Sequence, residues 1–395
     1  MPTNQRKNAR KERSRKNEAK TRKIIWAVLI FIIIVLIIMR VCEIDFASLK
    51  NRFTDANGNF TLSLVTDENE YPLSIDSSKD VSVNVVSDKL NVLTDVSYSV
   101  YNPATAKKLY SFNHGYANPI LKCAGTYNCL YDQGSYRLRL DTNKENVYET
   151  TAKKPILAAD VSKKGVVIYA TRGDKTKSKL FVYDKSLKKK AEIDVNDGYI
   201  VSVAIDPSGK KIAYAVVNSK NATFTTTVFT QYVSDEKSTA SFSYPNTSVL
   251  SLKFANSSDL YFVGTDTVSV ISSLKNKTDV HKNGSISTLS YCYTDDNELV
   301  VAYSDYENAS NGKVEYIRPS GNVKTTINLD KKAKYISSSS NEICVLYNDR
   351  VDVFSLTKGE RNESYKCDDS VTSVHKLSSR VYASHQKVID LLDKQ

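Results

Sequence analysis

One run of apolar residues stands apart from the rest of the chain. Residues 24–39 are sixteen consecutive apolar positions, and thirteen of them are Ile, Leu, Val or Phe. These side chains contribute roughly −4 to −8 kcal/mol toward membrane insertion. Val41 and Cys42 bring the run close to the ~20 residues of a bilayer span, provided that Arg40 extends its charged end to the headgroups. We therefore predict a transmembrane helix over residues 24–42.

From residue 60 onward the pattern is that of β-strands. Short runs rich in Val, Ile, Tyr, Thr and Phe alternate with turns made of Gly, Asn, Asp, Ser and Lys. The clearest strands lie at residues 179–184, 199–205 and 211–217. No amphipathic helix of ten or more residues is evident in this region. The sequence therefore predicts an all-β domain.

The strand runs repeat at the interval of propeller blades. The first strands of successive units start near residues 81, 118, 155, 200, 247, 285, 332 and 370. These intervals are close to the ~40–45 residues of a four-stranded blade. After residue 370 there is room for only three strands, and an unpaired candidate at residues 60–65 would complete the last blade and remove both open edges. We predict an eight-bladed propeller, with seven blades as the alternative.

Charge is concentrated before the apolar run. The net charge of the chain is +11, and residues 1–23 carry +8 of it. Under the positive-inside rule, this tail lies in the cytoplasm, residues 24–42 form an uncleaved signal anchor, residues 43–59 are a linker, and residues 60–395 lie outside the membrane. The tail has no aromatic residue for stacking on bases, so we expect it to orient the helix. The expected contact of residues 24–42 is membrane lipid, and we expect no nucleic-acid partner.

One turn carries a resemblance to known propellers. Residues 206–211 read Asp-Pro-Ser-Gly-Lys-Lys between two apolar strands. This turn resembles turns of bacterial WD40-like and TolB-like propellers, and the whole layout is similar to a family of uncharacterised, membrane-anchored bacterial propellers with a domain of unknown function. The resemblance implies the fold and no activity. Trp26 is the one tryptophan of the chain, so the Trp-Asp dipeptide of typical WD40 repeats and the tryptophan-docking blades of quinoprotein dehydrogenases are absent.

The chain lacks the common motifs for catalysis and cofactor binding. The sequence holds no P-loop, no Gly-x-Ser-x-Gly elbow and no His-Glu-x-x-His. The four histidines do not stand at metal-ligand spacing. We therefore assign no catalytic residue, no metal and no cofactor. Cys123 and Cys129 have two interpretations: a disulfide across a hairpin, or two small buried strand residues.

The candidate ligand-binding residues lie on one set of loops. In a propeller, the loops that enter each blade share a face with the loops that join its second and third strands. Tyrosines there can stack on a sugar or anchor a peptide, and Gly115-Tyr116 and Gly198-Tyr199 fall at equivalent places in the repeat. The candidate residues are His114, Tyr116, Asn196, Asp197, Tyr199, Tyr244, Asp305 and Tyr306. Lysine pairs gather in the turns of the opposite face, which could contact anionic lipid or a wall polymer.

Two functional hypotheses follow from these patterns. The leading one is a membrane-anchored, extracytoplasmic binding or scaffolding module, whose partner is a protein or a cell-wall polymer. The alternative is an extracytoplasmic enzyme, a polysaccharide lyase or hydrolase, with Tyr, His and Asp side chains in the central cleft. The enzyme hypothesis requires His114 or an aspartate such as Asp197 near the central funnel.

Overall fold

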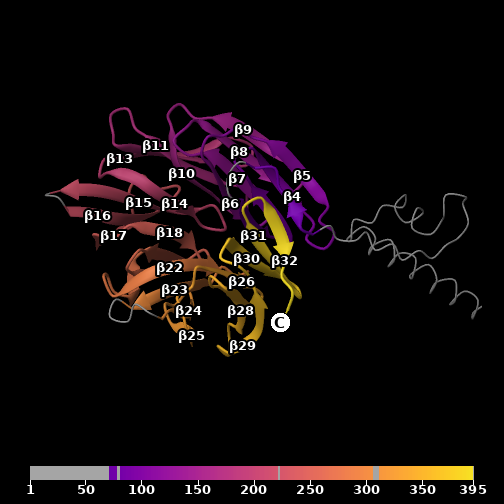
Figure 1. The fold of residues 1–395 in the computed structure, drawn as a ribbon. Coiled ribbons are helices and arrows are strands. Elements are labelled where there is room, and N and C mark those ends of the chain that lie inside the picture. The colour runs from indigo at the N-terminus through magenta and orange to yellow at the C-terminus, as the bar shows by residue number, and fades with distance from the viewer. Residues whose placement is uncertain (1–70, 78–80, 221–222, 306–310, 395) are drawn as a thin grey trace, which may run out of the picture. The chain divides into compact units, whose positions relative to one another are not determined.

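The protein folds as an eight-bladed β-propeller. A computed structural model describes residues 71–77, 81–220, 223–305 and 311–394. Eight antiparallel sheets of four strands follow one another around a central axis (Figure 1). The all-β class and the eight blades are therefore confirmed over the seven-bladed alternative. The predictions for residues 1–23, 24–42, 43–59 and 60–65 lie outside the described residues. The described ranges contain no helix with the length and hydropathy of a bilayer span.

Blades 1 to 7 each take four strands in chain order. Blades 1 and 2 are β2 (Ser82–Val86), β3 (Lys89–Leu93), β4 (Ser97–Tyr101) and β5 (Lys108–Asn113), then β6 (Pro119–Ala124), β7 (Tyr127–Asp132), β8 (Arg137–Thr142) and β9 (Asn146–Thr151). Blades 3 and 4 are β10 (Ile156–Val161), β11 (Val167–Arg172), β12 (Ser178–Tyr183) and β13 (Lys189–Val195), then β14 (Tyr199–Ile205), β15 (Lys211–Lys220), β16 (Thr223–Tyr232) and β17 (Ala240–Pro245). Blades 5 and 6 are β18 (Val249–Phe254), β19 (Asp259–Gly264), β20 (Val268–Ser272) and β21 (Asn276–His281), then β22 (Ile286–Tyr293), β23 (Leu299–Asp305), β24 (Lys313–Ile317) and β25 (Val323–Asn328). Blade 7 is β26 (Tyr335–Ser339), β27 (Glu342–Leu346), β28 (Arg350–Ser355) and β29 (Arg361–Lys366), and blade 8 holds β30 (Val371–Leu377), β31 (Arg380–His385) and β32 (Val388–Leu391).

The first strand of each blade is the innermost one, because these strands contact their counterparts in neighbouring blades. Successive strands are antiparallel, so their connections alternate between the two ends of the blade. Connections between the first and second strands and between the third and fourth strands form one face, which we call the turn face. Connections between the second and third strands and from blade to blade form the other, which we call the inter-blade face. The eight inner strands surround the central channel.

The last blade is completed by the N-terminal strand β1 (Leu73–Ser74), which pairs with β32. This shared blade was expected, but its fourth strand is Leu73–Ser74, and residues 60–65 lie outside the described part of the chain. The Tyr71 hydroxyl donates to the carbonyl oxygen of Pro103 at 2.9 Å. Pro103 lies in the connection between β4 and β5, so the described chain enters the propeller at the turn face.

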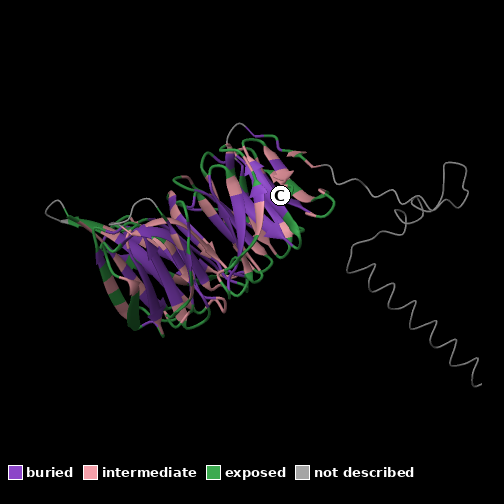
Figure 2. Ribbon diagram, turned by 60° about the horizontal axis from the view of Figure 1, so that its bottom comes forward, coloured by how far each residue is buried: buried purple, intermediate pink, exposed green. Residues whose placement is uncertain are grey.

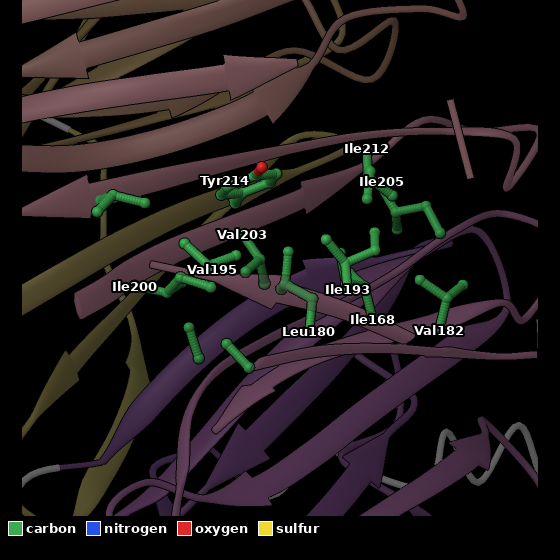
Figure 3. Packing of buried hydrophobic residues seen from close by; sticks show 13 residues of the cluster. Ile168, Leu180, Val182, Ile193, Val195, Ile200, Val203, Ile205, Ile212 and Tyr214 are labelled. Atoms are coloured by element: carbon green, nitrogen blue, oxygen red, sulfur yellow. The ribbon is translucent and has the colours of Figure 1, made fainter. Parts of the chain in front are cut away.

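Apolar side chains fill the spaces between neighbouring blades. Figure 3 shows the cluster between blades 3 and 4, where Leu180 and Ile193 meet Val203 and Ile212. Side chains of a strand alternate between its two faces, so each blade offers one apolar set to each neighbour. Burying a large aliphatic side chain contributes ~1.5–3 kcal/mol. Figure 2 shows the buried positions along the strands and most exposed ones at the connections.

Candidate ligand site at the mouth of the central channel

His114 is buried in the connection between blades 1 and 2. Its Nδ1 accepts the backbone N–H of Tyr116 at 2.9 Å, and its Nε2 lies 3.0 Å from the carbonyl oxygen of Thr94. Since Nδ1 accepts, Nε2 carries the proton and donates it. Burial lowers the pKa of His114, so the ring is neutral. Both ring nitrogens are therefore engaged in holding the loop.

Tyr116 and Tyr244 are packing residues between blades. Tyr116 is buried, and the Arg137 guanidinium lies 4.6 Å from its ring centroid. Tyr244 is buried and stacks on Phe262 with ring centroids 3.8 Å apart. Tyr116 precedes β6 by three residues, whereas Tyr199 begins β14. The two Gly-Tyr pairs are therefore not equivalent, which corrects the sequence comparison.

The remaining candidate residues differ in their surroundings. Asn196 and Asp197 are exposed in the connection between blades 3 and 4, and the adjacent Tyr199 is 53% exposed. The carboxylate of Asp305 pairs with Lys313 at 2.6 Å. Tyr306 lies outside the described residues. The structure therefore brings an exposed polar and aromatic group together at residues 196–199.

A β-bulge occurs at the same place in the inner strands of four consecutive blades. Near the inter-blade end of β10, β14, β18 and β22, one residue of the inner strand has no partner in the second strand. Bulges re-aim side chains and occur often beside binding sites. The bulged residues are Leu157, Val201, Leu250 and Leu289, and we call them the apolar crescent. The inner strand of blade 8 has a bulge at the corresponding Thr372.

The apolar crescent exposes hydrophobic surface where a propeller normally hides it. Val201 is 41% exposed and Leu250 is 40% exposed, although both lie on innermost strands. An inner strand is covered along one edge by the second strand and on both faces by the neighbouring blades. Both side chains lie within three residues of the inter-blade end of their strands, where this cover ends. Leu157 and Leu289 are half-buried, and they pack against the apolar clusters between blades 3 and 4 and between blades 6 and 7.

Sequence reasoning missed the apolar crescent. The run at residues 199–205 was recognised as a strand, but a continuous apolar run is typical of a strand buried on both faces. A bulge is recognised only from the pairing with the neighbouring strand. In β14, Ile200 pairs with Val216 and Ser202 pairs with Ala215, so Val201 is left without a partner. The alternation of one strand does not show it.

Cys123 and Cys129 are both free in the structure. Their hairpin pairs Lys122 with Cys129 and Cys123 with Asn128. Neighbouring positions of a strand point to opposite faces, so the two thiols lie on opposite sides of the sheet. The buried-residue interpretation therefore replaces the disulfide. Within the described ranges, no cluster of three or more His, Cys, Asp and Glu side chains has a geometry that could hold a metal ion.

Comparisons with known proteins match the fold and give no activity. The model of DUF5711, a family of unknown function, matches residues 74–391. No curated protein matches the chain. Saccharomyces cerevisiae Sqt1 shares 10% identity, with 82% of this chain and 98% of that chain covered and a TM-score of 0.53.

Two further solved structures have the same architecture. The C-terminal WD40 domain of Sif2 shares 12% identity, with 81% and 97% of the two chains covered and a TM-score of 0.56. A eukaryotic initiation factor shares 11% identity, with 82% and 90% covered and a TM-score of 0.53. At this level of identity the likeness concerns the propeller fold alone.

Proposed function

The chain belongs to the DUF5711 family of unknown function, and we propose that it is a membrane-anchored binding module that holds a partner protein at the mouth of its central channel. The observation that carries the proposal is the apolar crescent. Four consecutive inner strands bulge at one level, and two of the bulged side chains, Val201 and Leu250, are exposed there. A propeller fold alone implies no function, so the proposal depends on the exposed apolar residues at this site.

The surroundings of the apolar crescent have the anatomy of a protein-binding site. Interfaces combine a hydrophobic centre with a polar rim, and aromatic residues are enriched among their anchors. Here Tyr199 stands beside Val201 on β14, and Asn196 and Asp197 are exposed next to it. We propose that the occupant is an extended protein segment that inserts an apolar side chain into the mouth.

The described chain enters the propeller at the turn face, where the Tyr71 hydroxyl donates to the carbonyl oxygen of Pro103. Tyr199 and Leu250 lie toward the opposite, inter-blade face. Anchoring is proposed through residues 24–42, with the basic tail in the cytoplasm and the propeller outside, on the strength of the apolar run and the charge asymmetry.

One observation counts against the histidine of the enzyme hypothesis. That hypothesis needs an aspartate such as Asp197, or the His114 imidazole, at the funnel. Both nitrogens of this ring already hydrogen-bond to the backbone of Thr94 and Tyr116. A general base needs a free nitrogen within reach of the substrate.

The test is cross-linking of the full-length, C-terminally tagged protein in intact cells with a membrane-impermeant reagent. Wild type is expected to capture a defined partner protein. The double variant Val201→Ser with Leu250→Ser is expected to lose that partner by tenfold or more, because it removes the exposed apolar centre. Since both side chains are about 40% exposed, folding should change little, and the melting temperature checks this.

The chain offers a matched control on the turn face. Leu187 is 39% exposed and Val323 is 41% exposed there, so Leu187→Ser with Val323→Ser removes similar apolar surface from the other end. This variant is expected to keep the partner. Equal loss in both variants would sink the proposed site. Capture only after the cells are permeabilised would overturn the extracytoplasmic placement, and recovery of wall polymer without protein would overturn the protein partner.

A further inference from the structure

The turn-face end of the central channel carries charged side chains on its inner strands. Lys122 lies two residues before the end of β6, and Asp160 and Lys253 each lie one residue before the ends of β10 and β18. The three residues therefore stand at a similar level, near the turn face. The apolar crescent lies at the other end of the same strands, so the channel has an apolar mouth and a charged base.

The charged groups are held by contacts that leave them without direct ion pairs. The Asp160 carboxylate accepts the backbone N–H of Ile205 at 3.1 Å. The Lys253 ammonium lies 4.8 Å from the ring centroid of Tyr293, whose hydroxyl is 2.7 Å from that of Ser251. Among the ion pairs of the described ranges, none joins Asp160 to Lys122 or Lys253. The aromatic ring fixes the position of Lys253 and gives it no hydrogen-bond acceptor of full charge.

The three groups sense one another electrostatically. Burial lowers the pKa of Lys253, Asp160 opposes the shift, and the positive charges of Lys122 and Lys163 add to it. Burial raises the pKa of Asp160, and the two lysines Lys122 and Lys253 oppose that shift. These charge effects accord with the placement of the three residues at a similar level on the inner strands.

Water nevertheless reaches this cluster. Asp160 and Lys253 are half-buried although they lie on innermost strands, and Lys122 is exposed. Lys163 stands nearby on the turn face, where its Cγ lies 3.7 Å from the position that a Cβ on Gly125 would occupy. Gly125 directly follows β6, which places Lys163 beside the strand that carries Lys122.

We propose that the turn-face end of the channel binds a small anion, a phosphate or carboxylate group, between Lys122 and Lys253. The site holds three ammonium groups, those of Lys122, Lys163 and Lys253, and one carboxylate, that of Asp160. It therefore has an excess of two positive charges. Lys253 lacks an anionic partner that a bound anion would supply, and charge-assisted hydrogen bonds are the strong ones. The negative charge of Asp160 weakens the site for anions.

The experiment is isothermal titration of the detergent-solubilised full chain with inorganic phosphate and, in parallel, with succinate. Lys253→Met is expected to weaken binding about tenfold or more, since it removes a central positive charge at nearly constant side-chain length. Asp160→Asn is expected to tighten binding by about 3–10-fold, because the amide can still accept from Ile205 while the repulsive charge is gone. These opposite signs are the signature of a built anion site.

A matched control uses Lys188, which is exposed on the turn face in the connection between β12 and β13. Lys188→Met is expected to leave affinity unchanged. Binding that falls as much in this variant as in Lys253→Met would reduce the effect to general surface charge and overturn the proposal. Absence of binding by both ions up to about 10 mM, a Kd too weak for a specific site, would also overturn it.

The source of the anion is distinguished by a second arm. Co-sedimentation with phosphatidylglycerol vesicles that inorganic phosphate displaces, and that Lys253→Met abolishes, would assign the site to a lipid headgroup. Titration without vesicle binding would assign it to a free anion. Leu250→Ser should leave anion binding intact, so failure here and failure of the proposed protein-binding role are separable. Melting temperatures verify folding, and removal of the buried charge in Lys253→Met is expected to leave stability equal or higher.

Discussion

At the scale of single residues, His375 shows what a polar group on an inner strand costs. It lies on β30, is buried, and contacts the Tyr335 ring edge-on at 5.9 Å between centroids. Within the described residues its Nε2 has no hydrogen-bond partner. Burial lowers the pKa of His375 to about 4, against an ordinary value of 6.5. The folded protein therefore holds this ring in its neutral form.

The expected consequence is a loss of stability in mild acid. Because the folded pKa lies below the unfolded one, the contribution of His375 is fully present above pH 6.5 and is lost as the pH falls toward 4. Between pH 7 and 4.5 the loss amounts to about 2–3 kcal/mol. His375→Leu should remove this part of the pH dependence in urea unfolding, whereas His385→Leu in the next strand should retain it. Equal pH dependence in wild type and His375→Leu would contradict the assignment.

At the scale of elements, the turn between β14 and β15 shows why its residue types are required. The buried carboxylate of Asp206 accepts the backbone N–H groups of Ser208, Lys210 and Lys211 at 2.7–3.0 Å. Gly209 has a φ of +73°, and a Cβ there would stand 2.6 Å from Val166. The turn therefore requires an aspartate at position 206, which closes it, and a glycine at position 209, which permits the positive φ.

Replacing the capping carboxylate should therefore destabilise the whole blade. Asp206→Ala leaves three partly buried N–H groups without the carboxylate that accepts them and should cost about 2–4 kcal/mol in the free energy of unfolding. Asp184 supplies a matched comparison, since it accepts the N–H groups of Ser186 and Lys188 in an exposed turn. Asp184→Ala should lower the melting temperature much less. A similar decrease in both variants would show that burial of the carboxylate is irrelevant.

The sequence predicted local features such as this turn and the strands beside it, but not the contacts between strands and blades. Strand alternation and turn residues are local properties, so the predicted starts of the inner strands, such as residues 200 and 370, lie within three residues of the observed β14 and β30. The bulges at Val201 and Leu250 depend on the partner strand. The burial of Tyr244 depends on Phe262 in the next blade. Such properties are set between elements, which a single chain pattern does not encode.

At the scale of the whole molecule, the ring is closed by a very small element. β1 contributes two residues, paired as Leu73 with Ile389 and Ser74 with Val388. Tyr382 reinforces the closure, because its hydroxyl donates to the Pro103 carbonyl at 3.1 Å and its ring lies 5.4 Å from that of Tyr71. Closure joins the two ends of the described chain, so it constrains nearly all of the described residues as one loop.

A disulfide between β1 and β32, which we call the seam, tests the pairing register of these strands and their contribution to stability. Ser74→Cys with Val388→Cys places thiols on directly paired residues and closes a loop of more than 300 residues. Loop-closure entropy favours such a bond, and oxidation should raise the melting temperature by roughly 5 °C, reversibly with reductant. Burial raises the pKa of all five cysteines in the described ranges, which slows their competing reactions.

The control for the seam shifts the register by two residues. Ser74→Cys with Asp390→Cys keeps the same face of β32 but moves the second thiol away from its partner, since Ser74 pairs with Val388. Strand geometry separates positions two residues apart by about 6.6 Å, beyond the reach of an unstrained disulfide. This pair should stay reduced and leave the melting temperature unchanged. If it oxidised as readily as the matched pair, β1 would not hold a fixed register, and the ring would be closed by general packing rather than by this strand.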